Sequence, residues 1–242
     1  MRNWIAAAGL SLLGLTACNT SENVVEQTQA PESPVITMAD IMPVVQAKTP
    51  QAKAKQEKFL KQNVKRFRSR KLAAAYYVAQ AKRTFNEQKL DSAKYLFSRA
   101  WLMDSTNKAI YRGYGRIYGQ QKEYNKALFI LYRALEADRQ NPQLLTDIAT
   151  SHLGRFYETS DPADLQQSKK LLEQAVTLAP DQADTYYKLA INSYYLQEYG
   201  KAWRYLHQSL HQDREIADKH FISALLAKQN DPRGIYTEAN VQ

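Results

Sequence analysis

The stretch "NEQKLDSAKYLFSRA", residues 86–100, begins with polar residues and continues with small and large apolar side chains at helical spacing. Ala93 is followed by Phe97 four residues later and by Ala100 three residues after that. The same order of side-chain sizes returns three more times, beginning at Ala127, Ser168 and Ala202. A pattern that recurs at a fixed period predicts a repeat architecture, in which each unit packs on the next.

A second pattern precedes each of these segments. A large residue is followed four positions later by a small one at Tyr77–Ala81, Tyr111–Gly115, Leu145–Ala149 and Tyr186–Ala190. Two antiparallel helices need small residues where their backbones approach and large ones where a side chain fills the neighbouring groove. The register advances by 34 residues, apart from seven extra residues in the third unit. The chain therefore predicts four helix–turn–helix units.

The third unit differs from the others by its extra residues. Asp161 and Pro162 are typical of a helix N-cap followed by proline at the first helical position. We therefore expect the extra residues to lengthen the loop between the two helices, around residues 154–160.

These motifs resemble the tetratricopeptide repeat (TPR), and the resemblance covers residues 74–216. It implies an all-α fold, a right-handed superhelix of four repeats at residues 74–107, 108–141, 142–182 and 183–216. Residues 217–228 fit the solvating end helix that such a stack requires, which closes a domain of residues 74–228. We expect residues 229–242 to form a flexible tail.

The resemblance also implies a binding surface, because the first helices of TPR units line a concave groove. Arginine and tyrosine are the residue types that dominate binding hot spots, so the groove should favour an extended or helical segment with acidic groups. The alternative is a solvated face with nothing bound. Mapping the register onto this chain gives the candidates Lys82, Arg112, Arg116, Thr146, Thr150, Tyr187, Tyr194 and Tyr195.

The first eighteen residues have the features of an export signal. Arg2 precedes a short apolar run, too short to span a membrane, and the run leads to "LTAC" and the single cysteine, Cys18. This resembles a bacterial lipoprotein signal, in which the cysteine is lipidated and becomes the mature N-terminus; an ordinary cleaved signal peptide is the alternative. Asn19 resembles the sorting pattern of a lipoprotein anchored on the periplasmic face of the outer membrane.

Residues 19–50 contain four prolines among polar residues, which predicts a disordered linker. Residues 35–45, "VITMADIMPVV", are too apolar for a pure spacer. They could dock on a partner or on the domain itself, but we favour chance composition.

Residues 51–73 are predicted to form a basic amphipathic helix. Residues 51–72 hold nine Lys or Arg and one acid, so that their net charge is +8. Leu60, Val64 and Phe67 recur at helical spacing. The helix could be a solvated cap, or it could contact anionic lipid headgroups. The candidates for membrane contact are Lys65, Arg66, Arg68, Arg70 and Lys71.

Catalytic and metal-binding motifs are not evident. "GYGRIYG", residues 113–119, has its third glycine one place too far for a dinucleotide loop, and Gly115 is the expected packing residue. His207 and His211 could share a helix face, but no third ligand is evident, and we expect both to be exposed. The sequence therefore predicts no enzyme, no metal and no cofactor, and the export signal argues against nucleic acid.

Together these features predict a lipid-anchored adaptor that faces the periplasm and binds a protein or peptide. TPR lipoproteins of this shape resemble those that assist pilus or secretin assembly, of the tight-adherence or type IV kind. The alternative is an adaptor for peptidoglycan-modifying enzymes. The expected partner is accordingly a secretin, a pilus component or a cell-wall enzyme, with the membrane reached through the lipid on Cys18.

Overall fold

The computed structural model describes residues 35–42 and 48–237. Within them the secondary structure is entirely α-helical, which confirms the predicted fold class. The helices are α1 (Met38–Ile41), α2 (Pro50–Phe67), α3 (Arg70–Asn86), α4 (Leu90–Met103), α5 (Lys108–Gln120), α6 (Tyr124–Glu136), α7 (Pro142–Thr159), α8 (Pro162–Leu178), α9 (Ala183–Tyr195), α10 (Tyr199–Gln212) and α11 (Lys219–Leu226).

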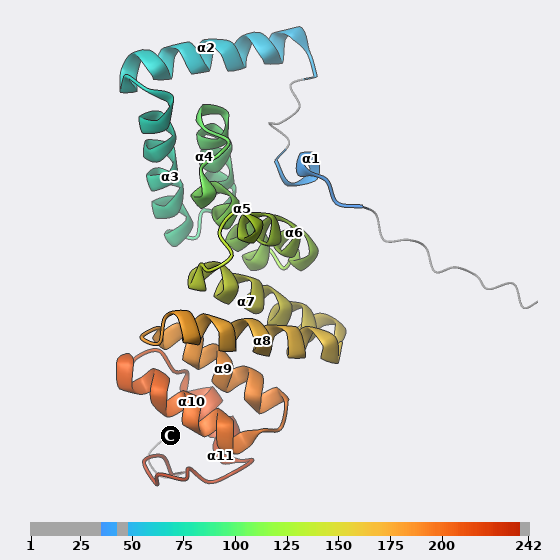
Figure 1. Cartoon of the computed structure of the whole chain (residues 1–242), viewed down its shortest axis with the longest axis vertical. Coiled ribbons are helices and arrows are strands. Elements are labelled where there is room, and N and C mark those ends of the chain that lie inside the picture. The colour runs from blue at the N-terminus through green and yellow to red at the C-terminus, as the bar shows by residue number, and fades with distance from the viewer. Residues whose placement is uncertain (1–34, 43–47, 238–242) are drawn as a thin grey trace, which may run out of the picture. The chain divides into compact units, whose positions relative to one another are not determined.

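Helices α3 to α10 form four antiparallel pairs that stack in chain order (Figure 1). Within the stack, the first helix of each pair also contacts the first helix of the next pair. The small residues of the periodic pattern on the second helices are fully buried in this stack: Ala93, Ala127, Ser168 and Ala202. The helix–turn–helix repeats predicted from the sequence are thereby confirmed.

Two glycines show how tightly the helices approach one another. A Cβ atom on Gly115 would lie 2.3 Å from the Leu131 side chain, and one on Gly154 would lie 2.3 Å from the Tyr124 ring. Both distances are below van der Waals contact, so each large side chain occupies the space that its glycine leaves. Gly115 is therefore a packing residue, as predicted.

The third repeat corrects an expectation. The extra residues do not lengthen a loop; they lengthen helices, because α7 has 18 residues and α8 has 17, against 13 in each of α5 and α6. The chain reverses at Ser160, whose φ is 56°, and the Asp161 side chain accepts a hydrogen bond from the Ala163 amide at 2.9 Å. The predicted cap and the proline at the first helical position are confirmed.

The basic segment also ends earlier than expected. Helix α2 stops at Phe67 rather than at residue 73, since Arg68 has a φ of 63° and Ser69 caps α3. The following residues belong to the first repeat. Phe59, Leu60 and Phe67 pack against the first repeat, whereas Val64 is 38% exposed and does not belong to the apolar face.

Residues 36–42, here called the strap, dock on the repeat domain. Ile41 and Met42 are fully buried, and the Tyr118 hydroxyl donates a hydrogen bond to the Ile41 carbonyl at 2.8 Å. The interpretation of this apolar stretch as chance composition is therefore wrong for the strap. Cys18, the signal segment and the linker up to residue 34 lie outside the described residues.

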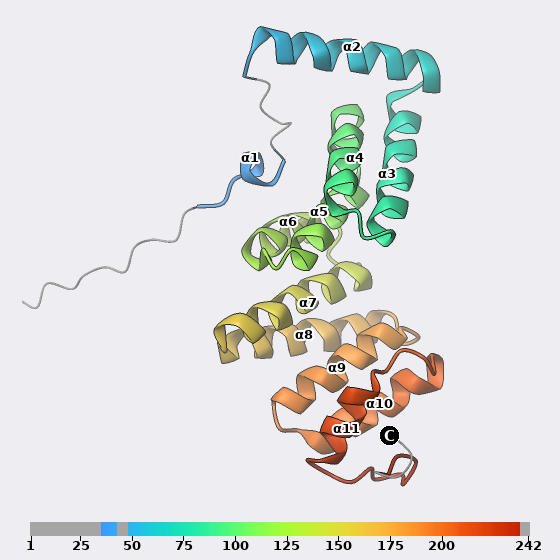
Figure 2. The same cartoon turned by 180° about the vertical axis from the view of Figure 1, so that it is seen from behind.

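The C-terminal end is closed by α11 and by the residues after it (Figure 2). Ile222 and Leu225 of α11 are buried. Asp231 accepts hydrogen bonds from three backbone amides, and His207 lies 3.2 Å from the same carboxylate. His207 is only 6% exposed. The expectation that His207 is exposed is therefore wrong. The expectation of a flexible tail from residue 229 is wrong for residues 229–237, which pack on the domain.

None of the described helices is long and apolar enough to cross a bilayer.

Candidate functional site: the inner face of the repeats

The first helices of the repeats line two neighbouring hollows, which together are called the groove. The first hollow, of about 240 Å³, lies between α3, α5 and the start of α7. The second, of about 590 Å³, lies between α5, α7 and α9. Phe85 and Arg116 line both, so the two hollows adjoin one another.

The first hollow combines aromatic walls with positive charge. Phe85 and Phe97 supply the rings, and a Cβ on Gly113 would lie 2.1 Å from the Phe97 ring, so this glycine makes room for it. Its lining residues include four cations and no carboxylate, and the cations are Lys82, Lys108, Arg112 and Arg116. An anionic group beside an apolar one matches this lining.

Arg112 is bound to the next repeat. Its Nε donates to the Asp147 carboxylate at 2.5 Å, and its Nη1 donates to the Gln143 side chain. Desolvation raises the pKa of Asp147, and the guanidinium of Arg112 acts in the opposite direction. Arg112 therefore joins the second repeat to the third, and this predicted binding residue has a structural partner.

Arg116 and Lys82 are more available than Arg112. The Arg116 guanidinium lies over the Phe85 ring, 4.6 Å from its centroid, at the junction of the two hollows. Within the part of the chain that the structure describes, neither residue forms an ion pair. Stacking on an aromatic ring fixes a guanidinium without neutralising its charge.

The second hollow has mixed charge. Asp147 lines it, as does the ion pair between Asp184 and Lys188. Thr150, a predicted groove residue, lies in its wall and donates its hydroxyl to the Thr146 carbonyl at 2.7 Å. This hollow therefore offers less net positive charge than the first.

An aromatic pair lies at the far end of α7 and α9. Tyr195, predicted from the register, is 43% exposed, and its ring centroid lies 5.2 Å from that of Tyr157, which is 50% exposed. The repeat register does not predict Tyr157, because this residue falls in the seven-residue expansion, where the other repeats have no counterpart. Its only sequence signal is an aromatic residue inside that expansion.

Three predicted groove residues are wholly or partly covered by other parts of the fold. Thr146 is 6% exposed, and its hydroxyl lies 3.0 Å from that of Thr185. The Tyr187 hydroxyl accepts a hydrogen bond from the Asp218 amide at 3.2 Å, and the Tyr194 ring packs 5.8 Å from Phe221. All three lie on first helices; Thr146 is buried against α9, and Tyr187 and Tyr194 are half-buried against α11 and its N-cap.

Of the predicted membrane-contact residues, two make specific contacts within the protein. The Arg70 guanidinium donates to the carbonyls of Met103 and Leu102 at 2.8 Å each and so caps the C-terminus of α4. Arg66 lies over the rings of Phe67 and Tyr76. The others, Lys65, Arg68 and Lys71, are exposed.

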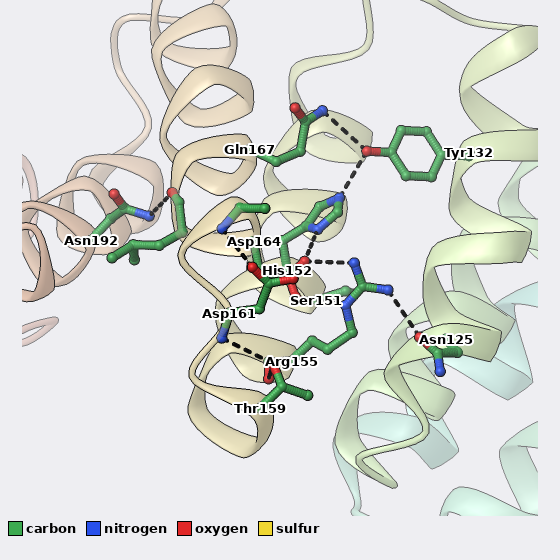
Figure 3. A network of polar contacts seen from close by, with 12 residues as sticks. Asn125, Tyr132, Ser151, His152, Arg155, Thr159, Asp161, Asp164, Gln167 and Asn192 are labelled. Atoms are coloured by element: carbon green, nitrogen blue, oxygen red, sulfur yellow. Dashed lines mark hydrogen bonds and ion pairs between the residues drawn. The ribbon is translucent and has the colours of Figure 1, made fainter. Parts of the chain in front are cut away.

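Figure 3 shows a polar network that joins the second repeat to the third. His152 lies 2.6 Å from Asp164 through Nδ1 and 2.8 Å from the Tyr132 hydroxyl through Nε2. Arg155 donates to both carboxylate oxygens of Asp164 and to Asn125 at 2.9 Å. Such an Asp–His–Tyr chain could in principle activate a nucleophile.

The surroundings of this network indicate a structural role. His152 and Asp164 are 6% and 2% exposed, and neither lines the groove. Their polar atoms are used in contacts that join α6, α7 and α8. In the described residues no cluster of three or more His, Cys, Asp or Glu side chains has an arrangement that could hold a metal ion.

Comparisons with known proteins agree on the fold. Residues 85–148 match the family model described as tetratricopeptide repeat. No curated protein matches the chain. Among solved structures, TTC0263, a thermophilic TPR protein of Thermus thermophilus, superposes with a TM-score of 0.57 at 17% identity over 64% of this chain and 80% of that chain.

Two further structures show the same architecture. PilF of Pseudomonas aeruginosa has a TM-score of 0.55 at 18% identity, over 71% of this chain and 81% of its own. MamA has a TM-score of 0.51 at 16% identity, over 67% and 86%. The chain thus has the TPR superhelical fold predicted from its repeats.

Proposed function

We propose that this chain is a non-enzymatic adaptor whose groove binds a protein or peptide segment carrying an acidic side chain next to an apolar one. One observation carries this proposal: the Arg116 guanidinium lies over the Phe85 ring where the two hollows adjoin, with no ion-pair partner among the described residues. A cation fixed in this way loses little side-chain entropy when it meets a carboxylate.

We further propose that Cys18 carries a lipid and that the adaptor works at the periplasmic face of the outer membrane, where it assists assembly of a pilus or secretion machine. This rests on the signal-like residues 1–18 and on the resemblance to TPR lipoproteins. Incorporation of a labelled fatty acid tests the anchor: the native chain should take up label and Cys18→Ser should not. Labelling of both would contradict it.

Photo-crosslinking in the native cell would identify the partner. A benzophenone side chain placed at Lys82, on the rim of the first hollow, should yield a discrete adduct with one envelope protein. The matched control is the same probe at Arg204, an exposed residue of α10 that lies over the Tyr205 ring. A secretin or pilus component would support the assembly role, and a cell-wall enzyme would favour the alternative adaptor role. Equal adducts at both positions would contradict capture by the groove.

A further inference from the structure

The N-terminal end of the repeats carries a hollow that does not belong to the groove. It has a volume of about 410 Å³ and lies between α2, α3 and α4. Arg66 of α2 and Arg99 of α4 line it together with Phe59, Tyr77 and Tyr95, and its lining includes no carboxylate. Two guanidinium groups from separate helices therefore share one concave surface.

Aromatic rings hold both arginines. Arg99 lies 4.5 Å from the centroid of Phe59 and 4.7 Å from that of Tyr95, and its Nη2 donates to the Tyr95 hydroxyl at 2.5 Å. Arg66 lies 5.0 Å from the centroid of Phe67. Neither makes an ion pair with another described residue. Guanidinium groups fixed in this way keep their charge and present planar pairs of N–H donors, which match phosphate oxygens.

The polar groups of Asn63 and Tyr77, which also line this hollow, already have hydrogen-bond partners within the protein. Asn63 donates to the Phe59 carbonyl at 2.8 Å and accepts the Tyr77 hydroxyl at 2.8 Å. The ring centroids of Phe59 and Tyr77 lie 5.7 Å apart. These side chains are therefore fixed by the protein itself, which leaves the two arginines as the charged donors that line the hollow.

The surface around the hollow is both basic and aromatic. Residues 51–72 contain nine Lys or Arg and only one acid, Glu57. Tyr95, which lies beneath Arg99, is 56% exposed, and Tyr76, which lies beneath Arg66, is 38% exposed. Cations beside exposed tyrosines are typical of surfaces that rest on the headgroup region of a membrane.

We infer that the hollow binds the phosphate of an anionic phospholipid headgroup, and that the end formed by α2, α3 and α4 rests on a membrane surface. A free phosphate or an acidic peptide would share the arginine chemistry. The net charge of +8 on residues 51–72 favours the lipid surface, and so do the exposed Tyr95 and Tyr76 beneath Arg99 and Arg66, because tyrosines next to cations are typical of surfaces at the headgroup region. The inference depends neither on the groove nor on lipidation of Cys18.

Vesicle binding tests it with the full chain carrying Cys18→Ser, to which no acyl chain can attach at that position. At about 0.15 M salt, vesicles containing phosphatidylglycerol should bind and pure phosphatidylcholine vesicles should bind far more weakly. The decisive variant is R66K/R99K, which keeps both charges but loses both planar forks. We expect it to bind the anionic vesicles at least about tenfold more weakly.

The matched control is Arg204→Lys, an exposed arginine over one tyrosine at the other end of the repeats, and it should bind like the parent. Tyr95→Ala provides a second variant, since Tyr95 is largely exposed and its loss leaves Arg99 less constrained; we expect a loss of a few-fold. Unchanged urea midpoints would show that these variants fold.

Three outcomes would overturn the inference. Equal vesicle binding by R66K/R99K and the parent would show that the cations act diffusely. Saturable binding of inorganic phosphate without arginine-dependent binding to vesicles would assign the hollow to a free anion. Binding of a polyglutamate peptide, again without binding to vesicles, would assign it to an acidic protein segment.

Discussion

The two ends of the repeat stack are closed in different ways. At the C-terminal end, Trp203 is 1% exposed, its indole nitrogen donates to the Gln229 carbonyl at 2.9 Å, and Tyr236 stacks on it. At the N-terminal end, Phe59 and Phe67 of α2 are only partly buried. Both ends must be covered because a repeat stack exposes an apolar face at each terminus. The C-terminal cover is a sealed cap, whereas the N-terminal cover leaves arginines and tyrosines on an open surface.

We expect the largest loss of stability from a substitution that disrupts the C-terminal cap. Trp203→Ala should lower the free energy of unfolding by about 3–5 kcal/mol, because it removes a fully buried ring and leaves a cavity. Urea denaturation followed by circular dichroism measures this. The matched change at the other end, Phe59→Ala, should lower it by about 1–2 kcal/mol, because that ring is only partly buried. Equal losses at the two ends would contradict the comparison.

The strap provides the next test, because it is a local element held by two buried side chains. Ile41→Ala should destabilise the fold by about 2 kcal/mol, as for other buried isoleucines. Thr37→Ala, which removes the short hydrogen bond to Asp40 on the exposed side of the strap, should cost less than about 1 kcal/mol. Protease cleavage near residue 43 would report release of the strap. Resistance of the Ile41→Ala variant equal to that of the parent would contradict docking.

We expect acid to destabilise the third repeat rather than the two ends of the stack. Desolvation lowers the pKa of His152, although the bond to Asp164 opposes it. Burial by itself raises the pKa of Asp164, but hydrogen bonds from Arg155 and His152 outweigh it, so this pKa lies below its usual value.

The sign is the same for both groups. Below about pH 6.5 the unfolded chain binds a proton at His152 more readily than the folded chain does. The free energy of unfolding therefore decreases as the pH is lowered, by at most about 1.4 kcal/mol per pH unit. The stability contributed by ionised Asp164 is lost only in more acidic solution, below about pH 3.8. Urea titrations between pH 7 and pH 5 should show this slope, and His152→Gln should flatten it. An unchanged slope in that variant would exclude His152 as its source.

The smallest expected effect concerns the turns inside the repeats. Gln88, Lys122 and Gln197 each have a φ of 60°, a conformation that glycine adopts without strain. Lys122→Gly should therefore stabilise the fold slightly, by about 0.5–1 kcal/mol, because relief of the strain outweighs the added entropy of the unfolded chain. A destabilisation in thermal unfolding would show that the Lys122 side chain makes a compensating contact.

Much of the fold could be predicted because its determinants are local and periodic. Ala93, Phe97 and Ala100 fix a helix face by their spacing alone, and the same pattern recurs at the predicted positions. The extra residues of the third repeat could not be predicted as helix, because Gly154 is unfavourable inside a helix, and the sequence pattern does not show that the Tyr124 ring of α6 packs against this glycine.

The candidate site was only partly predictable for a related reason. The register correctly brought Lys82, Arg112 and Arg116 to one hollow. It could not show that Asp147 pairs with Arg112, or that α11 covers Tyr187, because both depend on residues from other units. Spacing predicts which side of a helix a residue takes, and tertiary contacts decide whether that side is open.

Capture of the partner after charge reversal in the groove tests the central claim most directly. The protein would be purified from its native membrane after mild crosslinking, and the partner would be quantified for the parent, for Arg116→Glu and for Arg204→Glu. We expect the parent and Arg204→Glu to retain the partner, and Arg116→Glu to lose most of it while keeping the parental urea midpoint. Undiminished recovery with Arg116→Glu would contradict the groove as the binding site.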